Sequence, residues 1–473
     1  MTSRPAIQLA LLLGEGALLL LSGGAMFVVI SRWAGPELLG EYALVFAWLM
    51  LAQGLASFGI PEFIMREIGR LADAGSKHAF HGMIIGAAFS VAATLMMAAC
   101  VPLFDYSPAL RNALWIASIA LLPAMLSGIC RAGFLAQRQM QWIFLIAACE
   151  TLVVVSVNTY LVLTGHGVVE LAATILAGKV LASVLSLWSF HRHAVALRWD
   201  FDLGFCKQLL PTIFTFGLGN ALGMVSLRIN AILLSVWGTM AAVGQYAVAT
   251  KLTEIALIVP SLFNQLLLPR LARRYATEGH REFGDLEGSI RSFFALAIPT
   301  GIGVILFARP IVTLIFGDEF VDAVLVLQVL MVCFLVECLD GLLGVVLKAA
   351  GLQSLDVRVY SVNPIVTVSL SLIAIPFLGG VGAALSKLAA TLCSSSLRIY
   401  AVAREVAPLG WFGIVAKPLA IAGAAAACSA VLVGVVPVAA SALVYACTCS
   451  VLLWLTRVFS FDALKAALQG PGG

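Results

Sequence analysis

Four basic residues lie inside long apolar stretches and are the side chains of this sequence best suited to chemistry: Lys179, Arg228, Lys251 and Lys387. A cation at the centre of a bilayer costs about 2.5–3.5 kcal/mol even on insertion-based scales, so it normally faces a cavity or a partner. Arginine is also favoured for bidentate recognition of phosphate. Arg228 is therefore the first candidate for substrate binding, and a structural pair with a carboxylate or backbone carbonyl is the alternative.

The three lysines differ in their surroundings. Lys179 and Lys387 could line one cavity from two halves of the chain, or could extend their ammonium groups to a membrane surface. Lys251 and Glu254 are candidates for the substrate cavity, but they are three residues apart and share one helix face, which favours an internal ion pair. Asn230 follows Arg228 by two positions and could donate hydrogen bonds to a sugar or to a neighbouring helix.

Acidic residues in the apolar stretches are candidates for ion coupling: Glu15, Glu150, Glu337 and Asp340. They could take up protons or hold a coupling cation. Protonated carboxyl groups held by neighbouring helices are the alternative interpretation.

Motifs for covalent, metal or nucleotide chemistry are not found in the sequence. We identify no nucleophile with a base, no metal constellation and no phosphate loop, so no cofactor is expected. His78 and His81 could form a metal pair, but solvated loop positions are the expected outcome. Gly217, Gly219 and Gly223 imitate a nucleotide-binding loop, yet no strand precedes them, and close helix packing is expected.

The composition places these side chains in a membrane. Of the 473 residues, 62% are hydrophobic and only 11% are charged, and the mean hydropathy is +1.04. Apolar stretches of about twenty residues recur along the chain, and a helix of that length crosses a hydrocarbon core of about 30 Å. Helices are expected because the bilayer interior offers no water to satisfy the backbone. The first stretch is too long for a secretory signal, so we expect it to be a retained helix.

The apolar stretches predict an all-α integral membrane protein with about fourteen transmembrane helices, near 7–30, 41–59, 79–104, 112–130, 142–164, 168–190, 207–235, 243–268, 289–308, 321–347, 359–377, 380–403, 412–434 and 437–456. With the N-terminus inside, 21 of the 28 Lys and Arg residues fall on the cytoplasmic side, three outside and four within helices. This excess predicts that both termini are cytoplasmic. It also explains the net charge of +4 without a nucleic-acid partner.

An internal repeat is visible at a shift of 204 residues. The shift aligns Trp33 with Trp237, and it aligns the Gly-x-Tyr-Ala motif that begins at Gly40 with the one that begins at Gly244. Two homologous halves, helices 1–6 and 7–12, are therefore predicted. Since each half has an even number of helices, the halves share one orientation. The predicted divisions are an N-lobe at 1–198, a C-lobe at 199–405, and helices 13 and 14 with the tail at 406–473.

Several runs then carry a family resemblance. They are Trp33 to Tyr42, Arg228 to Ser235, Val243 to Ala249, Leu268 to Tyr275 and Ile315 to Phe320. These runs resemble Wzx-type polysaccharide transporters of the multidrug/oligosaccharidyl-lipid/polysaccharide exporter superfamily. The resemblance covers about residues 7 to 405 and implies two six-helix lobes around a central cavity. It departs from the family at Asn230, where an acidic residue is common.

The resemblance implies a flippase that moves undecaprenyl-pyrophosphate-linked oligosaccharide from the cytoplasmic to the periplasmic leaflet by alternating access. Its setting would be the bacterial inner membrane, in lipopolysaccharide or exopolysaccharide biosynthesis, with a polysaccharide polymerase and assembly proteins as possible partners. An ion-coupled multidrug or cation antiporter of the same superfamily is the alternative. A membrane glycosyltransferase or polymerase is disfavoured because the loops are short, so the protein is not expected to be an enzyme.

Overall fold

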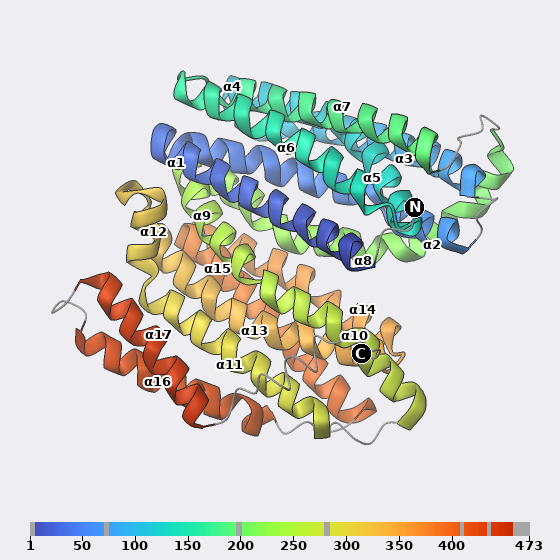
Figure 1. Ribbon diagram of the computed structural model, residues 1–473. Helices are drawn as coiled ribbons and strands as arrows, with labels where there is room; N and C mark the ends of the chain where they lie inside the picture. Colours follow the sequence, from blue (N-terminus) through green and yellow to red (C-terminus); the bar gives the residue numbers. More distant parts are fainter. Residues whose placement is uncertain are drawn as a thin grey trace. The chain divides into compact units, whose positions relative to one another are not determined.

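The structure, a computed structural model, describes residues 5–70, 75–194, 201–278, 284–406, 411–432 and 437–456. In these ranges the secondary structure is helical, with no strand (Figure 1). The chain divides into two compact units, residues 1–247 and 248–473. The prediction of an all-α membrane protein is therefore confirmed for the described residues.

The first unit carries the helices α1 (Pro5–Ser57), α2 (Ile60–Arg70), α3 (Gly75–Cys100), α4 (Pro108–Ile119), α5 (Leu121–Ala136), α6 (Met140–Leu163), α7 (Val168–His193), α8 (Leu203–Trp237) and the first part of α9 (Met240–Ala256). The second unit carries the rest of α9, then α10 (Ile258–Glu278), α11 (Gly284–Leu306), α12 (Ala308–Phe316), α13 (Ala323–Ala349), α14 (Gln353–Tyr360), α15 (Val362–Glu405), α16 (Trp411–Leu432) and α17 (Val438–Leu455). The predicted lobe boundaries at 198/199 and 405/406 stay a prediction.

Each predicted membrane helix overlaps a helical segment of the described residues, and residues 433 and 434 of the prediction 412–434 lie outside them. Among the described residues, eight helical stretches are long and apolar enough to cross a bilayer, or nine if a pair bent by 73° at Phe307 counts as one span. Two of the eight, Ala10–Ser57 and Gln353–Glu405, each contain two predicted spans. Three shorter apolar helices add to these. The count of fourteen therefore stays a prediction.

Two of the predicted connections between membrane helices are kinks at glycines in the structure. The predicted loop at 31–40 is wrong, because α1 is helical on both sides of Gly35, which has a φ of 77°. The predicted break near 376–380 is likewise a kink in α15 at Gly379, with a φ of 54°. Both φ values lie in the left-handed region, which glycine adopts without the steric cost of a Cβ. The sequence indicated where each helix is interrupted, but not that a single glycine makes the interruption.

A short amphipathic helix, α2, occupies a segment that was predicted only as a connection. Its residues Ile60, Phe63, Ile64 and Ile68 are buried, and their spacing of three and four places them on one face. They belong to the core of the first unit together with residues of α3, α5 and α7. The same periodicity is readable in the sequence, so this helix could have been predicted.

The paired Gly-x-Tyr-Ala motifs meet each other in the first unit. A Cβ placed on Gly40 of α1 would collide with the carbonyl oxygen of Met240, and one placed on Gly244 of α9 would collide with the carbonyl oxygen of Pro36. Pro36 and Met240 are separated by the same 204 residues as the two glycines. The contact is therefore reciprocal, as a local two-fold arrangement of the two segments would produce.

This crossing predicts a stability effect. Gly40→Ala and Gly244→Ala should each destabilise the protein by about 1–3 kcal/mol, because the added methyl group meets backbone that cannot rotate away. Thermal unfolding of the purified protein in detergent measures the change. Gly423→Ala is the control, since a Cβ there meets nothing within 4 Å. Unchanged unfolding of both crossing variants would contradict the close approach.

Candidate functional site: a charged cavity and intramembrane ion pairs

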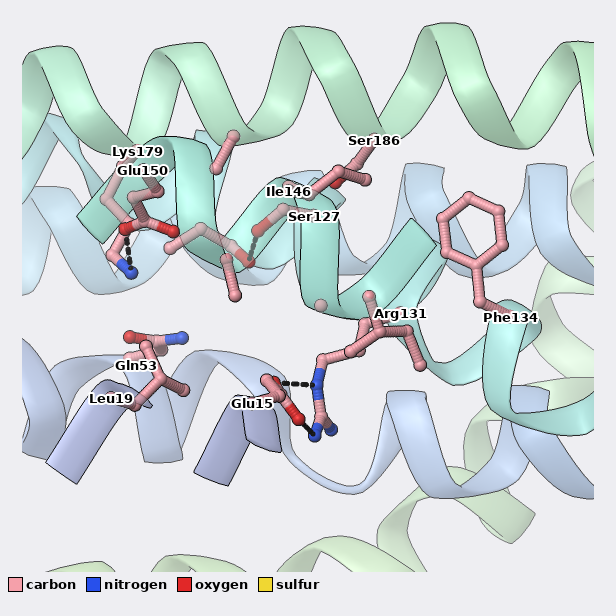
Figure 2. Close-up of a pocket in the computed structure, with 15 residues that line it drawn as sticks. Glu15, Leu19, Gln53, Ser127, Arg131, Phe134, Ile146, Glu150, Lys179 and Ser186 are labelled. Atoms are coloured by element: carbon pink, nitrogen blue, oxygen red, sulfur yellow. Dashed lines mark hydrogen bonds and ion pairs between the residues drawn. The ribbon is translucent and has the colours of Figure 1, made fainter. Parts of the chain in front are cut away.

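A cavity of about 260 Å³ opens within the first unit. Helices α1, α5, α6 and α7 supply most of its wall, and Figure 2 shows its charged and polar side chains. The polar and charged residues on the wall are Glu15, Gln53, Ser127, Arg131, Glu150, Lys179 and Ser186. An apolar helical unit thus has a cavity lined by charged side chains, which binding of an apolar lipid chain would not require.

Glu15 and Arg131 form the first ion pair of this cavity. Nε of Arg131 lies 3.0 Å from Oε1 of Glu15, and Nη2 lies 2.8 Å from Oε2. The pair is bidentate and joins α5 to α1 (Figure 2). The exposed fraction of the side chain is 5% for Glu15 but 47% for Arg131. The carboxylate is therefore buried, while about half of the arginine side chain is exposed.

Glu150 and Lys179 form the second pair, between α6 and α7. Nζ of Lys179 lies 2.7 Å from Oε1 of Glu150, with exposed fractions of 25% and 19%. Gly178 lets the two helices approach here, because a Cβ at that position would press against Val154 and reach 3.6 Å from Cγ of Glu150. Lys179 thus lines a cavity within the first unit. The predicted cavity that Lys179 would share with Lys387 stays a prediction.

The predicted charges of the second unit are paired between α13 and α15. Nζ of Lys387 lies 3.0 Å from Oε1 of Glu337, with exposed fractions of 14% and 20%. One helical turn further along α13, Asp340 accepts a hydrogen bond from Ser395 at 3.0 Å and pairs with Arg398. The ion-coupling candidates Glu337 and Asp340 are therefore both held by cations of α15.

Arg398 is the most buried cation of this network. Its side chain is 6% exposed and bridges Asp340 of α13 to Asp356 of α14, whose Oδ1 lies 2.8 Å from Nη2. Its Cζ also lies 5.2 Å from the centre of the Tyr360 ring. Lys348, half-exposed, approaches Asp356 at 3.6 Å. A guanidinium can satisfy two carboxylates at once because its donors form a planar fork.

Sequence reasoning missed Arg131, Arg398 and Asp356 as site residues. Both arginines are among the 21 basic residues that the predicted topology places on the cytoplasmic side, where a basic residue needs no further explanation. A signal was nevertheless present, because Glu15 and Asp340 are carboxylates in apolar stretches without a basic residue three or four positions away. Each therefore required a cation from another helix, and only the fold shows which one.

The candidates on α8 and α9 lie apart from the cavity wall. Arg228 is half-buried on α8, and Asn230 is buried, with its Nδ2 3.5 Å from the hydroxyl of Tyr246. Nζ of Lys251 lies 3.3 Å from Oε2 of Glu254, three residues further along the chain. This contact confirms the expected internal pair. The roles of all four residues in substrate binding stay predictions.

His81 corrects the expectation of a solvated loop position. It lies in α3 and is fully buried, with Nδ1 2.7 Å from the carbonyl of Lys77 and Nε2 3.0 Å from the backbone N–H of Asp202. Asp202 precedes α8 and accepts a hydrogen bond from the backbone N–H of Phe205, which together with Lys77 lowers the pKa of its carboxyl group. Within the described ranges, no three His, Cys, Asp or Glu side chains are grouped as a metal site would require.

The fold defines the class of protein. The structure superposes on the lipid II flippase MurJ in an inward closed conformation with a TM-score of 0.77, at 12% identity, over 95% of this chain and 100% of that one. It also superposes on an inward-facing multidrug resistance MATE family transporter of the MOP superfamily with a TM-score of 0.62, at 19% identity, over 81% and 95% of the chains. The chain thus has the fold of these transporters.

The family follows from the sequence itself. The profile of a family described as "Polysaccharide biosynthesis protein" matches residues 29–325, and the chain belongs to this family. A curated relative, the "Probable low-salt glycan biosynthesis flippase Agl15" of Haloferax volcanii, is 24% identical over 155 residues. That alignment spans 33% of each chain, so the chain matches about a third of the relative's length. The family resemblance noted in the sequence is confirmed.

The pairs between α13 and α15 predict an asymmetry between single and double substitutions. Lys387→Met or Glu337→Gln alone should destabilise the protein by about 3–5 kcal/mol, because each leaves its partner charged without compensation in a half-buried place. The double variant should recover most of that loss. Thermal unfolding in detergent measures all three. The control Arg404→Met breaks an exposed pair with Glu405 and should have little effect. Wild-type stability of both single variants would contradict this reading.

Proposed function

We propose that this protein is a flippase for lipid-linked oligosaccharide. Each hydroxyl of a sugar that leaves water without a partner costs on the order of a few kcal/mol, so an oligosaccharide does not cross lipid unaided. A charged cavity inside an apolar helical unit offers hydrogen-bond partners to a part of such a substrate. The cavity wall of Glu15, Arg131, Glu150 and Lys179 is the observation that carries the proposal, and membership of a polysaccharide biosynthesis family supports it.

The substrate in this proposal is an undecaprenyl-pyrophosphate-linked repeat unit. Its tail stays in the bilayer while its pyrophosphate needs cationic partners. It moves from the cytoplasmic to the periplasmic leaflet of the bacterial inner membrane, and a polymerase for lipopolysaccharide or exopolysaccharide would use it there. The names of two similar proteins, a lipid II flippase and a probable glycan biosynthesis flippase, support this class of substrate.

A drug or cation antiporter is the second candidate, because the fold is also that of MATE transporters. The charge of the cavity gives it no specific support. Two cations offset two carboxylates on the wall, so an organic cation would meet no excess of negative charge. A glycosyltransferase or polymerase is disfavoured because the family and fold are those of transport proteins, and the connections between the helices are short.

Arg228 provides a test of the proposal in cells. Arg228→Ala should leave the protein in the membrane but abolish surface glycan, while lipid-linked repeat units accumulate in the cytoplasmic leaflet. In this proposal Arg228 contacts the pyrophosphate, and the loss of such a charged contact costs about 2–5 kcal/mol of binding free energy. Arg228→Lys should restore glycan in part, because the point charge remains but the bidentate fork is lost.

The measurement is surface polysaccharide beside protein abundance in one strain. A structural role for Arg228 would make glycan fall in proportion to the amount of protein. Normal glycan at normal abundance would exclude Arg228 from substrate binding. Normal glycan in a strain that lacks the protein altogether would overturn the flippase proposal and favour the antiporter.

The proposed orientation has its own test, since the bias of basic residues predicts cytoplasmic termini. His166 lies between α6 and α7. In a variant without native cysteines, a cysteine introduced by His166→Cys should react with an impermeant thiol reagent in intact cells. Gln353→Cys begins α14 and should react only after permeabilisation. Both positions are exposed in the structure. The reverse pattern of labelling would invert the topology.

A further inference from the structure

The predicted cytoplasmic ends of α6 and α7 carry a cluster of aromatic side chains that lies outside the cavity wall. The ring centre of Trp142 lies 4.5 Å from that of His193 and 6.4 Å from that of Trp188. The rings of Trp188 and His193 are 6.1 Å apart, so each ring lies beside the other two. Cζ of Arg192 lies 5.8 Å from the centre of the Trp188 ring, within the range of a cation–π contact. Tryptophan is enriched at the level of lipid headgroups, where its ring meets hydrocarbon and its N–H meets water.

An exposed stripe on α7 leads to this cluster. Val180, Val184 and Trp188 are 45%, 59% and 53% exposed. Arg192, which is also exposed, continues the same spacing of four residues, and residues four apart lie on one face of a helix. At a rise of about 1.5 Å per residue, Val180 lies about 12 Å from Trp188 and about 18 Å from Arg192. One leaflet of the hydrocarbon core is about 15 Å thick, so a lipid whose acyl chain lies beside the valines would have its headgroup beside Arg192.

Two arginines at this end of the helices are exposed and lack a carboxylate. Neither Arg138 nor Arg192 forms an ion pair in the part of the chain that the structure describes. No Asp or Glu occurs in the turn between α5 and α6 or in the second half of α7. Nε2 of Gln139 donates a hydrogen bond to the carbonyl of His193 at 2.7 Å. Each arginine is the chain neighbour of one residue of this contact, so both lie at the same end of the two helices.

The turn between α5 and α6 also offsets the negative end of α7. The last carbonyl groups of a helix carry a partial negative charge, which disfavours an anion nearby. Here the carbonyl of His193 accepts from Gln139, and the carbonyl of Ala194 accepts from Nε2 of Gln137 at 2.9 Å. Arg138, between the two glutamines, has a φ of 57°, which glycine or asparagine adopts at lower cost, so turn formation does not explain an arginine there. The two guanidinium groups are then left to attract an anion.

We propose that these ends of α6 and α7 bind the phosphate headgroup of an anionic phospholipid of the bilayer. Arg138 and Arg192 contact the phosphate, Trp142 and Trp188 lie at the level of the glycerol, and one acyl chain follows the exposed valines of α7. The occupant is a phospholipid rather than a free anion, because the basic end continues into an apolar stripe of about the length of one leaflet. None of these side chains lines the cavity, so the inference does not depend on the proposed function.

Native mass spectrometry of the full-length protein in detergent tests this site, with phosphatidylglycerol as the probe and phosphatidylcholine as the comparison. The wild type should retain phosphatidylglycerol in preference to phosphatidylcholine. Arg138→Met and Arg192→Met should each weaken retention of phosphatidylglycerol about fivefold, and the double variant about thirtyfold, because each basic residue near an anionic headgroup contributes separately. Arg192→Lys should keep part of the affinity, since the charge remains and the fork is lost.

A matched control separates this site from a general effect of charge. Arg358 is an exposed arginine of α14, and Arg358→Met removes the same charge at another place. This variant should retain phosphatidylglycerol as the wild type does. Thermal unfolding without added lipid should be the same for all the arginine variants, because the side chains that they shorten are exposed.

Fluorescence places the lipid on α7. Phosphatidylglycerol with brominated acyl chains, added in equimolar amount, should quench the tryptophan fluorescence of the wild type, and Trp188→Phe should remove most of this quenching. Trp454→Phe is the control, since Trp454 of α17 is 77% exposed but lies outside the proposed site. Equal quenching in the wild type and in Trp188→Phe would contradict the proposed position of the lipid.

Other occupants of the surface give other results. Equal retention of the two phospholipids, or an equal loss of phosphatidylglycerol in Arg358→Met, would overturn the site. A second copy of the chain would make the arginine variants change the protein from dimer to monomer with no change in lipid retention, and this too would overturn it. Tighter retention of undecaprenyl phosphate than of phosphatidylglycerol, lost in the same variants, would assign the surface to a transport substrate instead. The experiment does not measure surface glycan, so its failure would leave the flippase proposal intact.

Discussion

Neutralisation of charge inside an apolar medium is the constraint on which the rest of this structure depends. A carboxylate or cation alone in hydrocarbon is so unfavourable that it must find a partner, be protonated or face water. The protein meets this requirement mainly between helices rather than along one helix. Glu15 is paired with Arg131, Glu150 with Lys179, and Glu337 with Lys387.

These ion pairs fix the position of one helix along its neighbour, which purely apolar helix surfaces would specify less well. Lipid tails are as apolar as leucine, so no hydrophobic effect drives helices together within the bilayer. Polar partners on facing helices and close contacts at small residues supply the specificity instead. The crossing of Gly40 and Gly244 is such a close contact, and α13 with α15 shows a polar seam that runs from Cys333 and Thr391 to Arg398.

The degree of burial divides the pairs into two kinds. Arg398 is enclosed by Asp340, Asp356 and the Tyr360 ring, and its removal would leave two buried carboxylates uncompensated. Such a network stabilises one arrangement of α13, α14 and α15. Arg131 lines the cavity and is half-exposed, so its pair with Glu15 is less enclosed than the network of Arg398. The same chemistry thus serves architecture in the second unit and a candidate binding site in the first.

Much of this protein was readable from the sequence, because the length and polarity of a membrane helix are local properties. Apolar stretches predicted the membrane helices of the described residues, the spacing of Lys251 and Glu254 predicted their pair, and loose motifs indicated the family. The cavity partners were not readable, since Glu15 and Arg131 are 116 residues apart and helix packing alone brings them together. The kink at Gly35 and the burial of His81 were decided in the same way, by backbone geometry and contacts that no local pattern encodes.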